Sequence, residues 1–161
     1  MVSLSSAAHR YGKINFDDLN FEHAEYNPSA AYSQSKLANA YFANEVDRRY
    51  QSQGVRALSV NPGGIITPLS RYLPSTKEVE EHPVISKLLQ NPAQGASTTV
   101  WAATAKELEG KGGLYLDETA EAERVPEDVP YYSGGYGANT FDPPVEKKLW
   151  AESLKLVGLG E

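Results

Sequence analysis

Hydrophobic and polar positions follow two different periods along the chain. From Ala30 to Ser52 no Gly or Pro interrupts the sequence, and apolar residues recur at helical spacing. These residues include Leu37, Ala38, Tyr41, Phe42 and Val46. Ser29 is of a type that favours helix N-caps, and Gly54 is of the type that ends helices. The pattern therefore predicts a helix over Ala30–Ser52.

Shorter patterns on both sides of this helix predict further elements. Strands are predicted at Val2–Ser5, Val55–Val60 and Gly113–Asp117. Helices are predicted at Val84–Leu89, Ala93–Leu108 and Pro143–Val157, whereas 9–28 and 118–144 are polar or irregular. The alternation of strands and helices predicts an α/β fold with a parallel sheet, built as one domain over residues 1–161.

Composition narrows the class of protein. The 161 residues carry a formal net charge of -6 and no cysteine. This charge, without a Lys/Arg stripe, argues against a nucleic-acid partner. The lack of cysteine excludes disulfides and thiolate metal sites and suits a reducing compartment. No run approaches the roughly 18 apolar residues of a membrane span, and the start, Met1–Ser6, lacks the features of a signal peptide. We therefore expect a cytoplasmic protein without a membrane segment.

Tyr32 and Lys36 are the most informative pair in the sequence. Residues four apart on a helix share one face, so the phenol and the ammonium are expected to lie together. A nearby cation favours the phenolate form of a tyrosine, which makes it a better general acid or base near neutral pH. The spacing alone is weak, because a chain of this composition yields about half a match by chance.

Two other segments strengthen the interpretation of this pair. Ser5 and Ser6 follow the first predicted strand, and Asn61–Gly64 follows the second. In open parallel sheets, ligands bind outside the carboxyl ends of the strands. Because Tyr32 lies near the start of the helix between these strands, all three features are expected at one rim of the sheet.

Three histidines and three tyrosines have plainer interpretations. His9, His23 and His82 have no carboxylate partner at metal-ligand spacing, so we interpret them as surface or packing residues and expect no metal site. The tyrosines either pack the irregular segment, which we favour, or rim a hydrophobic pocket; they are Tyr131, Tyr132 and Tyr136.

These motifs together resemble the C-terminal half of the short-chain dehydrogenase/reductase family. The matching pieces are Val2-Ser-Leu-Ser-Ser6, Tyr32-Ser-Gln-Ser-Lys36 and Asn61-Pro-Gly-Gly-Ile-Ile-Thr67. Within the family, the chain resembles the retinol-dehydrogenase-like branch and its fungal relatives. The segments that show this resemblance are Ser5-Ser-Ala-Ala-His9, Phe16-Asp-Asp-Leu19 and Ala31-Tyr-Ser-Gln-Ser-Lys-Leu-Ala-Asn39. The resemblance covers most of residues 1–116 and, more loosely, the terminal helix. It implies a partial Rossmann-like, doubly wound parallel sheet with the last three strands of the family fold.

The resemblance also implies an activity and catalytic roles. The family members are NAD- or NADP-dependent oxidoreductases that interconvert an alcohol with an aldehyde or ketone. Tyr32 would be the general acid or base, Ser6 would hydrogen-bond the reacting oxygen of the substrate, and Lys36 would support Tyr32 and bind the nicotinamide ribose. A homodimer formed through the helix equivalent to Ala30–Ser52 is also implied.

The same resemblance assigns binding roles beyond the catalytic residues. Cofactor contacts would come from Tyr32, Lys36, Pro62, Gly63, Ile65 and Thr67. The segment 65–90 corresponds in position to the substrate-binding loop of the family. Within it, Leu69 and Tyr72 would line an apolar substrate pocket or, alternatively, belong to the core.

One large part of the family pattern is missing. Members of the family begin with a strand, a Gly-rich turn and a helix that hold the dinucleotide pyrophosphate, and the sequence contains no such combination. We therefore expect the N-terminal dinucleotide-binding half to be absent and the chain by itself to be inactive. The alternative function is a non-catalytic fragment or interaction module, which pairs through an open sheet edge or through the 30–52 helix.

Overall fold

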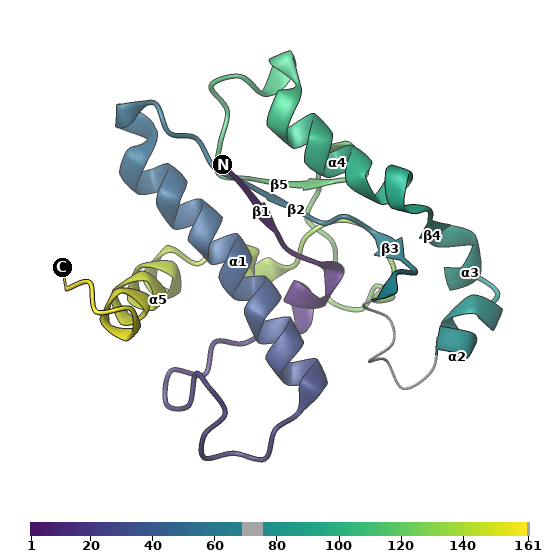
Figure 1. The fold of residues 1–161 in the computed structure, drawn as a ribbon, viewed down its shortest axis with the longest axis horizontal. Coiled ribbons are helices and arrows are strands. Elements are labelled where there is room, and N and C mark those ends of the chain that lie inside the picture. Colours follow the sequence, from purple (N-terminus) through teal and green to yellow (C-terminus); the bar gives the residue numbers. More distant parts are fainter. Residues whose placement is uncertain (69–75, 161) are drawn as a thin grey trace.

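The computed structural model describes residues 1–68 and 76–160, which fold around a four-stranded sheet of order β1-β2-β5-β6 (Figure 1). β1 (Val2–Leu4), β2 (Leu58–Val60) and β5 (Leu114–Asp117) are parallel. β6 (Ala120–Glu121) runs antiparallel to β5 and has no counterpart among the predicted strands. The α/β class and the partial parallel sheet are confirmed.

The three parallel strands end at one level. Leu4, Val60 and Leu116 lie opposite one another in the register. Backbone bonds continue past them, since the Ser5 N–H donates to Val60 O at 2.7 Å and the Asn61 N–H to Leu116 O at 2.9 Å. The residues that follow each strand are thereby gathered at one rim of the sheet.

The predicted long helix forms as α1 (Pro28–Tyr50), but it begins earlier than expected. Its N-cap is Asn27, whose side-chain oxygen accepts a hydrogen bond from the Ala30 N–H at 3.0 Å. A proline in the first helical position is already fixed in helical φ. The N-cap predicted at Ser29 is therefore wrong, because the Asn-Pro pair two residues earlier supplies both a cap and a start.

The strand after α1 begins later in the sequence than predicted, because the C-terminal end of α1 extends into the residues before it. α1 passes into a 3-10 turn at Gln51–Gln53, and Gly54 ends it with a φ of +81°. The Val55 N–H still donates back to Tyr50 O at 3.2 Å. The strand predicted from Val55 therefore begins only at Leu58.

Small polar side chains join α1 to one face of the sheet. The Ser3 hydroxyl donates to Asn39 O at 3.0 Å, and the Ser5 hydroxyl donates to Lys36 O at 2.8 Å. Ser5 is 2% exposed. Because successive side chains of a strand alternate between faces, Ser3 and Ser5 share the face that α1 covers. Their small size brings helix and strand close together, and their hydroxyls satisfy their own hydrogen-bonding needs in the contact.

The opposite face of the sheet carries the aliphatic core. Leu58, Val60 and Leu116 cluster there against α4 and the turn that follows it. α4 (Pro92–Thr104) starts in a capping box, in which Asn91 and Gln94 each bond the other's backbone N–H. It ends before the predicted Leu108, because residues 106–108 form a separate 3-10 turn.

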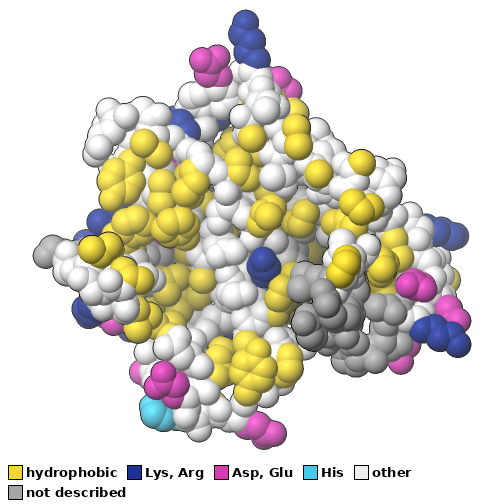
Figure 2. Space-filling view, in the orientation of Figure 1, with side chains coloured by type: hydrophobic (Ala, Val, Ile, Leu, Met, Phe, Trp, Pro, Cys, Tyr) yellow, Lys and Arg dark blue, Asp and Glu magenta, His cyan; other side chains and the backbone are white. Residues whose placement is uncertain are grey.

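α5 (Pro143–Leu156) packs against α1, on the side of α1 away from the sheet (Figure 1). Trp150 of α5 stacks on Phe42 of α1, with 5.7 Å between ring centroids. Glu146 is fully buried and is paired with Arg48 of α1. Figure 2 shows hydrophobic side chains gathered on the part of the surface where α1 and α5 lie in Figure 1.

Several short elements have no signal in the sequence pattern. They are the 3-10 turns Ala7–Tyr11 and Ala138–Thr140, α2 (Thr76–Glu81), and the parallel pair β3 (Gly64–Ile65) and β4 (Leu89–Gln90). The helix predicted at Val84–Leu89 forms as α3 (Ile85–Leu88). Within residues 1–68 and 76–160, no helix is both long and apolar enough to cross a bilayer.

The Ser5 contact gives a test of how α1 is attached. Replacing Ser5→Ala should lower the free energy of unfolding by about 1 kcal/mol, because the partly buried Lys36 carbonyl loses a hydroxyl donor. Ser35→Ala is the matched control, since the Ser35 hydroxyl donates to Tyr32 O at an exposed position. Urea unfolding of both variants measures the difference; equal stabilities would contradict this role of Ser5.

Candidate active site

Ser6 lies at the carboxyl end of β1, where two buried side chains hold its backbone. Its carbonyl accepts hydrogen bonds from the Tyr115 hydroxyl at 3.1 Å and from His9 Nδ1 at 2.6 Å. Its own hydroxyl accepts from the Ala8 N–H at 3.2 Å, as the N-cap of the 3-10 turn Ala7–Tyr11. In this contact the Ser6 hydroxyl oxygen is an acceptor, so its proton is not used by it.

His9 links this backbone to the C-terminal part of the chain. It is fully buried, and its Nε2 lies 2.8 Å from the Thr140 hydroxyl and accepts from the Gly137 N–H at 3.3 Å. Because the Gly137 N–H can only donate, Nε2 is the acceptor and the proton lies on Nδ1, which donates to Ser6 O. Burial lowers the pKa of His9 from 6.5 to about 4, with nearby Arg10 acting in the same direction. His9 is thus a neutral packing residue, as the sequence indicated.

Tyr115 completes the support beneath Ser6. Only 1% of Tyr115 is exposed, and burial raises its pKa well above the usual value for a tyrosine. The negative charges of Asp117 and of an ionised Tyr32 act in the same direction. The Tyr115 hydroxyl also lies 3.0 Å from His9 Nδ1, so the two buried side chains support Ser6 together.

Tyr32 and Lys36 lie on one face of α1, as their spacing predicts. Lys36 Nζ is 5.5 Å from the centroid of the Tyr32 ring. Tyr32 is 46% exposed near the start of α1, so it is open to solvent. The phenol and the ammonium therefore lie within electrostatic reach of each other at the rim of the sheet.

The Lys36 ammonium also reaches the end of β1. Its Nζ donates to Leu4 O at 3.3 Å, and Asn39 Nδ2 donates to the same oxygen at 2.8 Å. Sequence reasoning assigned no role to Asn39, although its position three residues after Lys36 places it on the same side of α1. Lys36 is thus brought within two residues of Ser6, and the three predicted catalytic residues share one end of β1 and α1.

A polar cleft of about 280 Å³ lies at the carboxyl ends of β2 and β5. Asn61 and Asp117, the residues at these ends, are joined by an Nδ2–Oδ1 hydrogen bond of 3.1 Å. Pro62 and Gly63 line the cleft, and Gly63 has a φ of +83° that favours glycine. The turn Asn61–Gly63 thus lies beside Ser5 and Ser6 along the rim, but the lining of this cleft does not include Ser6, Tyr32 or Lys36.

The other predicted binding residues are placed in part. Ile65 belongs to β3, and its side chain packs against α4 so tightly that a Cβ at Gly95 would lie 2.3 Å from it. The Ile65 side chain is thus directed at α4, although the residue is only partly buried. Thr67 follows β3 and is half-buried. Leu69 and Tyr72, the predicted substrate contacts, lie outside the described residues.

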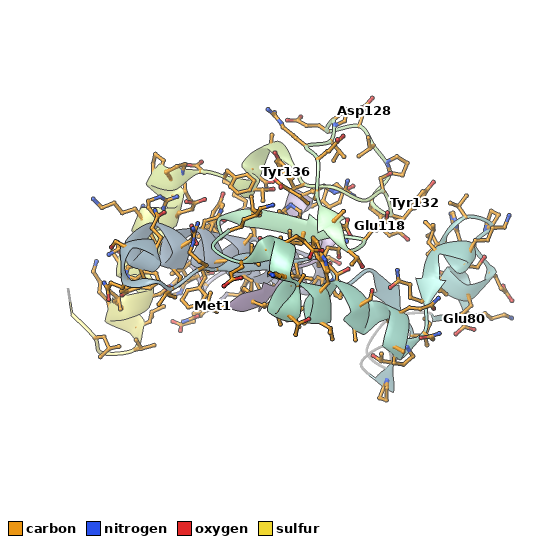
Figure 3. The ribbon with its side chains drawn as sticks, turned by 90° about the horizontal axis from the view of Figure 1, so that it is seen from above. Met1, Glu80, Glu118, Asp128, Tyr132 and Tyr136 are labelled. Carbon is orange, nitrogen blue, oxygen red and sulfur yellow. The ribbon has the colours of Figure 1, made fainter. Side chains whose placement is uncertain are left out.

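The segment after β5 borders the same rim (Figure 3). Figure 3 places Asp128 at the outer tip of this segment, with Tyr132 and Glu118 nearer the end of the strand. Tyr132 lines the polar cleft, whereas Tyr136 packs against Tyr115 with 6.3 Å between centroids. Tyr136 therefore packs as the sequence favoured, whereas Tyr132 borders a polar cleft and not the hydrophobic pocket of the alternative interpretation.

Comparison with known proteins gives the relationship of the whole chain. It is 44% identical over 163 residues to the short-chain dehydrogenase/reductase prx1 of Penicillium roqueforti. The alignment covers 100% of this chain and 47% of that protein. The oxidoreductase calI of Penicillium decumbens is 41% identical, and the alignment covers 99% of this chain and 48% of that protein. Human retinol dehydrogenase 13 is 36% identical, and the alignment covers 99% of this chain and 46% of that protein. No family model matches the sequence.

The chain corresponds to the C-terminal half of a short-chain dehydrogenase/reductase. It spans about half the length of the curated relatives it matches. Among solved structures, an uncharacterised protein from Mycobacterium paratuberculosis is 30% identical, with a TM-score of 0.66 over 99% of this chain and 50% of that chain. A short-chain dehydrogenase from Salmonella enterica, 22% identical with a TM-score of 0.50, covers 74% of this chain and 40% of that one and supports the fold alone.

The short-chain dehydrogenase/reductase family implies a nicotinamide dinucleotide, whose pyrophosphate needs a phosphate-binding turn. The turn after β1 leads into a 3-10 helix, the turn after β2 into β3, and the turn after β5 into antiparallel β6. None of these described turns is the Gly-rich turn that joins a strand to a helix N-terminus and cradles a pyrophosphate. The whole dinucleotide therefore does not fit the described part of this chain.

Burial of His9 makes stability depend on pH. Above pH 6.5 His9 is neutral in both the folded and unfolded chains; as pH falls from 6.5 to about 4, only the unfolded chain takes up this proton. The free energy of unfolding should fall across that window by about 3 kcal/mol, in excess of the contribution of the carboxylates. Urea unfolding at several pH values measures this loss.

A second histidine provides the control for this pH effect. His23→Asn, at an exposed position, should leave the pH dependence unchanged. A titration of the His9 ring by NMR that gave a pKa near 6.5 would contradict the buried neutral state.

Proposed function

We propose that this chain carries the proton-transfer part of an NAD(P)-dependent oxidoreductase that interconverts an alcohol and a carbonyl compound. The relatives are named as short-chain dehydrogenases/reductases, an oxidoreductase and a retinol dehydrogenase, which supports an oxidoreductase. The observation that carries the finer proposal is the approach of Lys36 Nζ to the Tyr32 ring, 5.5 Å, beside the end of β1 where Ser6 lies.

The proposed steps follow from the atoms at this rim. In reduction, the Tyr32 hydroxyl donates its proton to the carbonyl oxygen of the substrate; in oxidation, the phenolate removes the alcohol proton. The Ser6 hydroxyl donates a hydrogen bond to the same oxygen and orients it. The Lys36 ammonium stabilises the negative charge that Tyr32 acquires when it gives up its proton.

No residue of the chain supplies a hydride, and the described residues do not hold a whole dinucleotide. The nicotinamide end would contact Lys36, Pro62, Gly63, the Ile65 backbone and Thr67. We therefore propose that residues 1–161 alone are inactive and that turnover requires the half of the family fold that the chain does not match. A homodimer through α1 is the proposed assembly, supported by Phe42, which is 47% exposed on that helix. The cytoplasm remains the proposed location.

A second candidate function is supported by the open edge of the sheet. β1 is the outermost strand on its side within the described chain, and Leu4 is 45% exposed there. Exposed edge strands pair readily with other chains. In this second proposal the chain is a non-catalytic interaction module, and the test of Tyr32 distinguishes it from the first.

The proposed role of Tyr32 is tested in a chimera in which the unmatched half of the Penicillium roqueforti relative precedes Met1. Tyr32→Phe should lower kcat for carbonyl reduction by about 10²- to 10⁴-fold, because the general acid is lost. Tyr26→Phe is the matched control, since Tyr26 is 64% exposed in the loop before α1. Turnover is followed as absorbance of NADH or NADPH with a panel of aldehydes and ketones.

The chimera distinguishes the two candidate functions. Activity that survives Tyr32→Phe would contradict the proton-transfer role. An inactive chimera that nevertheless folds and binds the reduced nucleotide would favour the interaction module.

A further inference from the structure

A glutamine side chain forms part of the polar cleft at the carboxyl ends of β2 and β5. Gln90, the last residue of β4, lies opposite Ile65 in the register of the β3–β4 pair. A Cβ at Gly63 would lie 3.2 Å from Gln90 Oε1 and 3.3 Å from Gln90 Nε2, so the carboxamide lies directly against the turn Asn61–Gly63. Among the residues that the structure describes, none hydrogen-bonds this carboxamide, which leaves its donors and its acceptor for a ligand.

Two carboxylates contribute a second part of the lining. The Asp117 oxygens Oδ1 and Oδ2 each accept one hydrogen bond, at 3.1 and 3.0 Å, and each can accept another. Figure 3 shows Glu118 and Tyr132 together near the end of β5, and both line the cleft. A Cβ at Gly134 would lie 3.1 Å from Asp117 Oδ2 and 4.0 Å from Glu118 Cδ. Glycine at this position therefore leaves the carboxylates open to the cleft.

A cation and an aromatic ring complete the set of groups. Lys87 on α3 is exposed and has no ion-pair partner among the described residues. The Tyr132 ring is partly buried between His82 and Tyr131, whose ring centroids lie 5.9 and 5.5 Å from its own. The cleft of about 280 Å³ thus combines hydrogen-bond donors, hydrogen-bond acceptors and one flat apolar face.

This combination selects against three classes of ligand. An anion would meet the two carboxylates and a cation would meet the Lys87 ammonium, so neither sign of charge fits the whole lining. An apolar chain would remove water from the polar groups without replacing its hydrogen bonds. A hydroxyl group carries no charge and both donates and accepts hydrogen bonds. A neutral group with several hydroxyls therefore matches the lining best.

We propose that the polar cleft binds a neutral polyhydroxylated group, of the kind found in sugars and sugar alcohols. Gln90 and Glu118 hydrogen-bond its hydroxyls, and its C–H face covers the Tyr132 ring. A substrate that carries this group differs from the apolar one implied by the family resemblance. The assignment of the group to the substrate rests on the proposed function, whereas its binding in the cleft does not.

The cleft is within reach of the proposed proton-transfer residues. Ser5, Asn61 and Asp117 follow three neighbouring parallel strands, and the Ser5 and Asn61 N–H groups each bond the next strand. Two strand spacings place Asp117 about 10 Å from Ser5 along the rim. A sugar-sized carbonyl compound therefore reaches from Ser6 into the cleft, with its reacting carbon at the first and its hydroxyls in the second.

The test titrates residues 1–161, without cofactor, with four probes of equal carbon-chain length: sorbitol, gluconate, glucamine and hexanol. Sorbitol should shift the NMR signals of the Gln90 side-chain amide and the Gly134 backbone amide, with a Kd of about 1 mM or below and at least about tenfold below that of each other probe. The Trp150 indole N–H, on α5, is the internal control and should not shift. Equal or tighter binding of another probe would overturn the proposal, as would shifts that never saturate.

Two substitutions test the groups that recognise the hydroxyls. Gln90→Leu should weaken sorbitol binding by at least about fivefold, the effect of one neutral hydrogen bond. Gln53→Leu is the matched control; Gln53 is exposed in the turn after α1 and should have no effect. Glu118→Gln keeps an acceptor but removes the charge, so it should tighten gluconate binding by at least about twofold. Unchanged sorbitol binding by the Gln90 variant would contradict the proposal; if that variant does not fold, the Glu118 result decides.

The chimera with the unmatched half of the Penicillium roqueforti relative separates binding from turnover. In it, Gln90→Leu should raise KM for erythrose by at least about fivefold and leave KM for butanal unchanged, because only erythrose places hydroxyls in the cleft. An equal change for both aldehydes would overturn the assignment of the cleft to the substrate. Saturable sorbitol binding beside a chimera that reduces no carbonyl compound would contradict the proposed function and support the cleft as a polyol site.

Discussion

The contact on which the rest of the structure depends is the attachment of α1 to β1 by two serine hydroxyls. Ser3 and Ser5 bring the helix close to the strand and bond its Asn39 and Lys36 carbonyls. Because Ser6 follows Ser5 directly and Lys36 itself accepts the bond, the same contact fixes the separation between the strand end and the helix face. Larger side chains at these two positions would push α1 away from the sheet and move Tyr32 away from Ser6.

Leu4 O joins the architecture of the sheet to the chemistry of the rim. It belongs to the outward backbone of β1, yet its hydrogen-bond donors are Lys36 and Asn39 on α1. Beneath the same strand end, His9 and Tyr115 hold the Ser6 carbonyl and connect it to Thr140 near the C-terminus. The candidate site is therefore positioned by segments from both ends of the chain as well as by α1.

The sequence predicts the parts of this structure that have a strong local signal. The period of α1, the three short strands and the shared rim all follow from spacing and from the turn at Asn61–Gly64. The Asn27 cap was missed because Ser29 is an equally good cap type, and only the fixed φ of Pro28 decides between them. β3 and β4 have two residues each, too few for any periodicity.

The contacts around the site depend on residues distant in sequence, which no local pattern reports. In the sequence His9 is an isolated histidine, and only the fold brings its ring into hydrogen-bond contact with Thr140, 131 residues away. Asn39 reads as one more polar residue of a helix until β1 lies beneath it. The same holds for Asp117, whose carboxylate accepts a hydrogen bond from Asn61 at the end of the neighbouring strand.

The most direct test of this account is amide hydrogen exchange across residues 1–161 alone. The account predicts that amides in the middle of α1, such as Ala40 and Ala43, open together with those of β2, with opening free energies that agree within ~1 kcal/mol, because the serine contacts make helix and sheet one cooperative unit. Protected α1 amides beside β2 amides that exchange as fast as those of an unfolded peptide would contradict it.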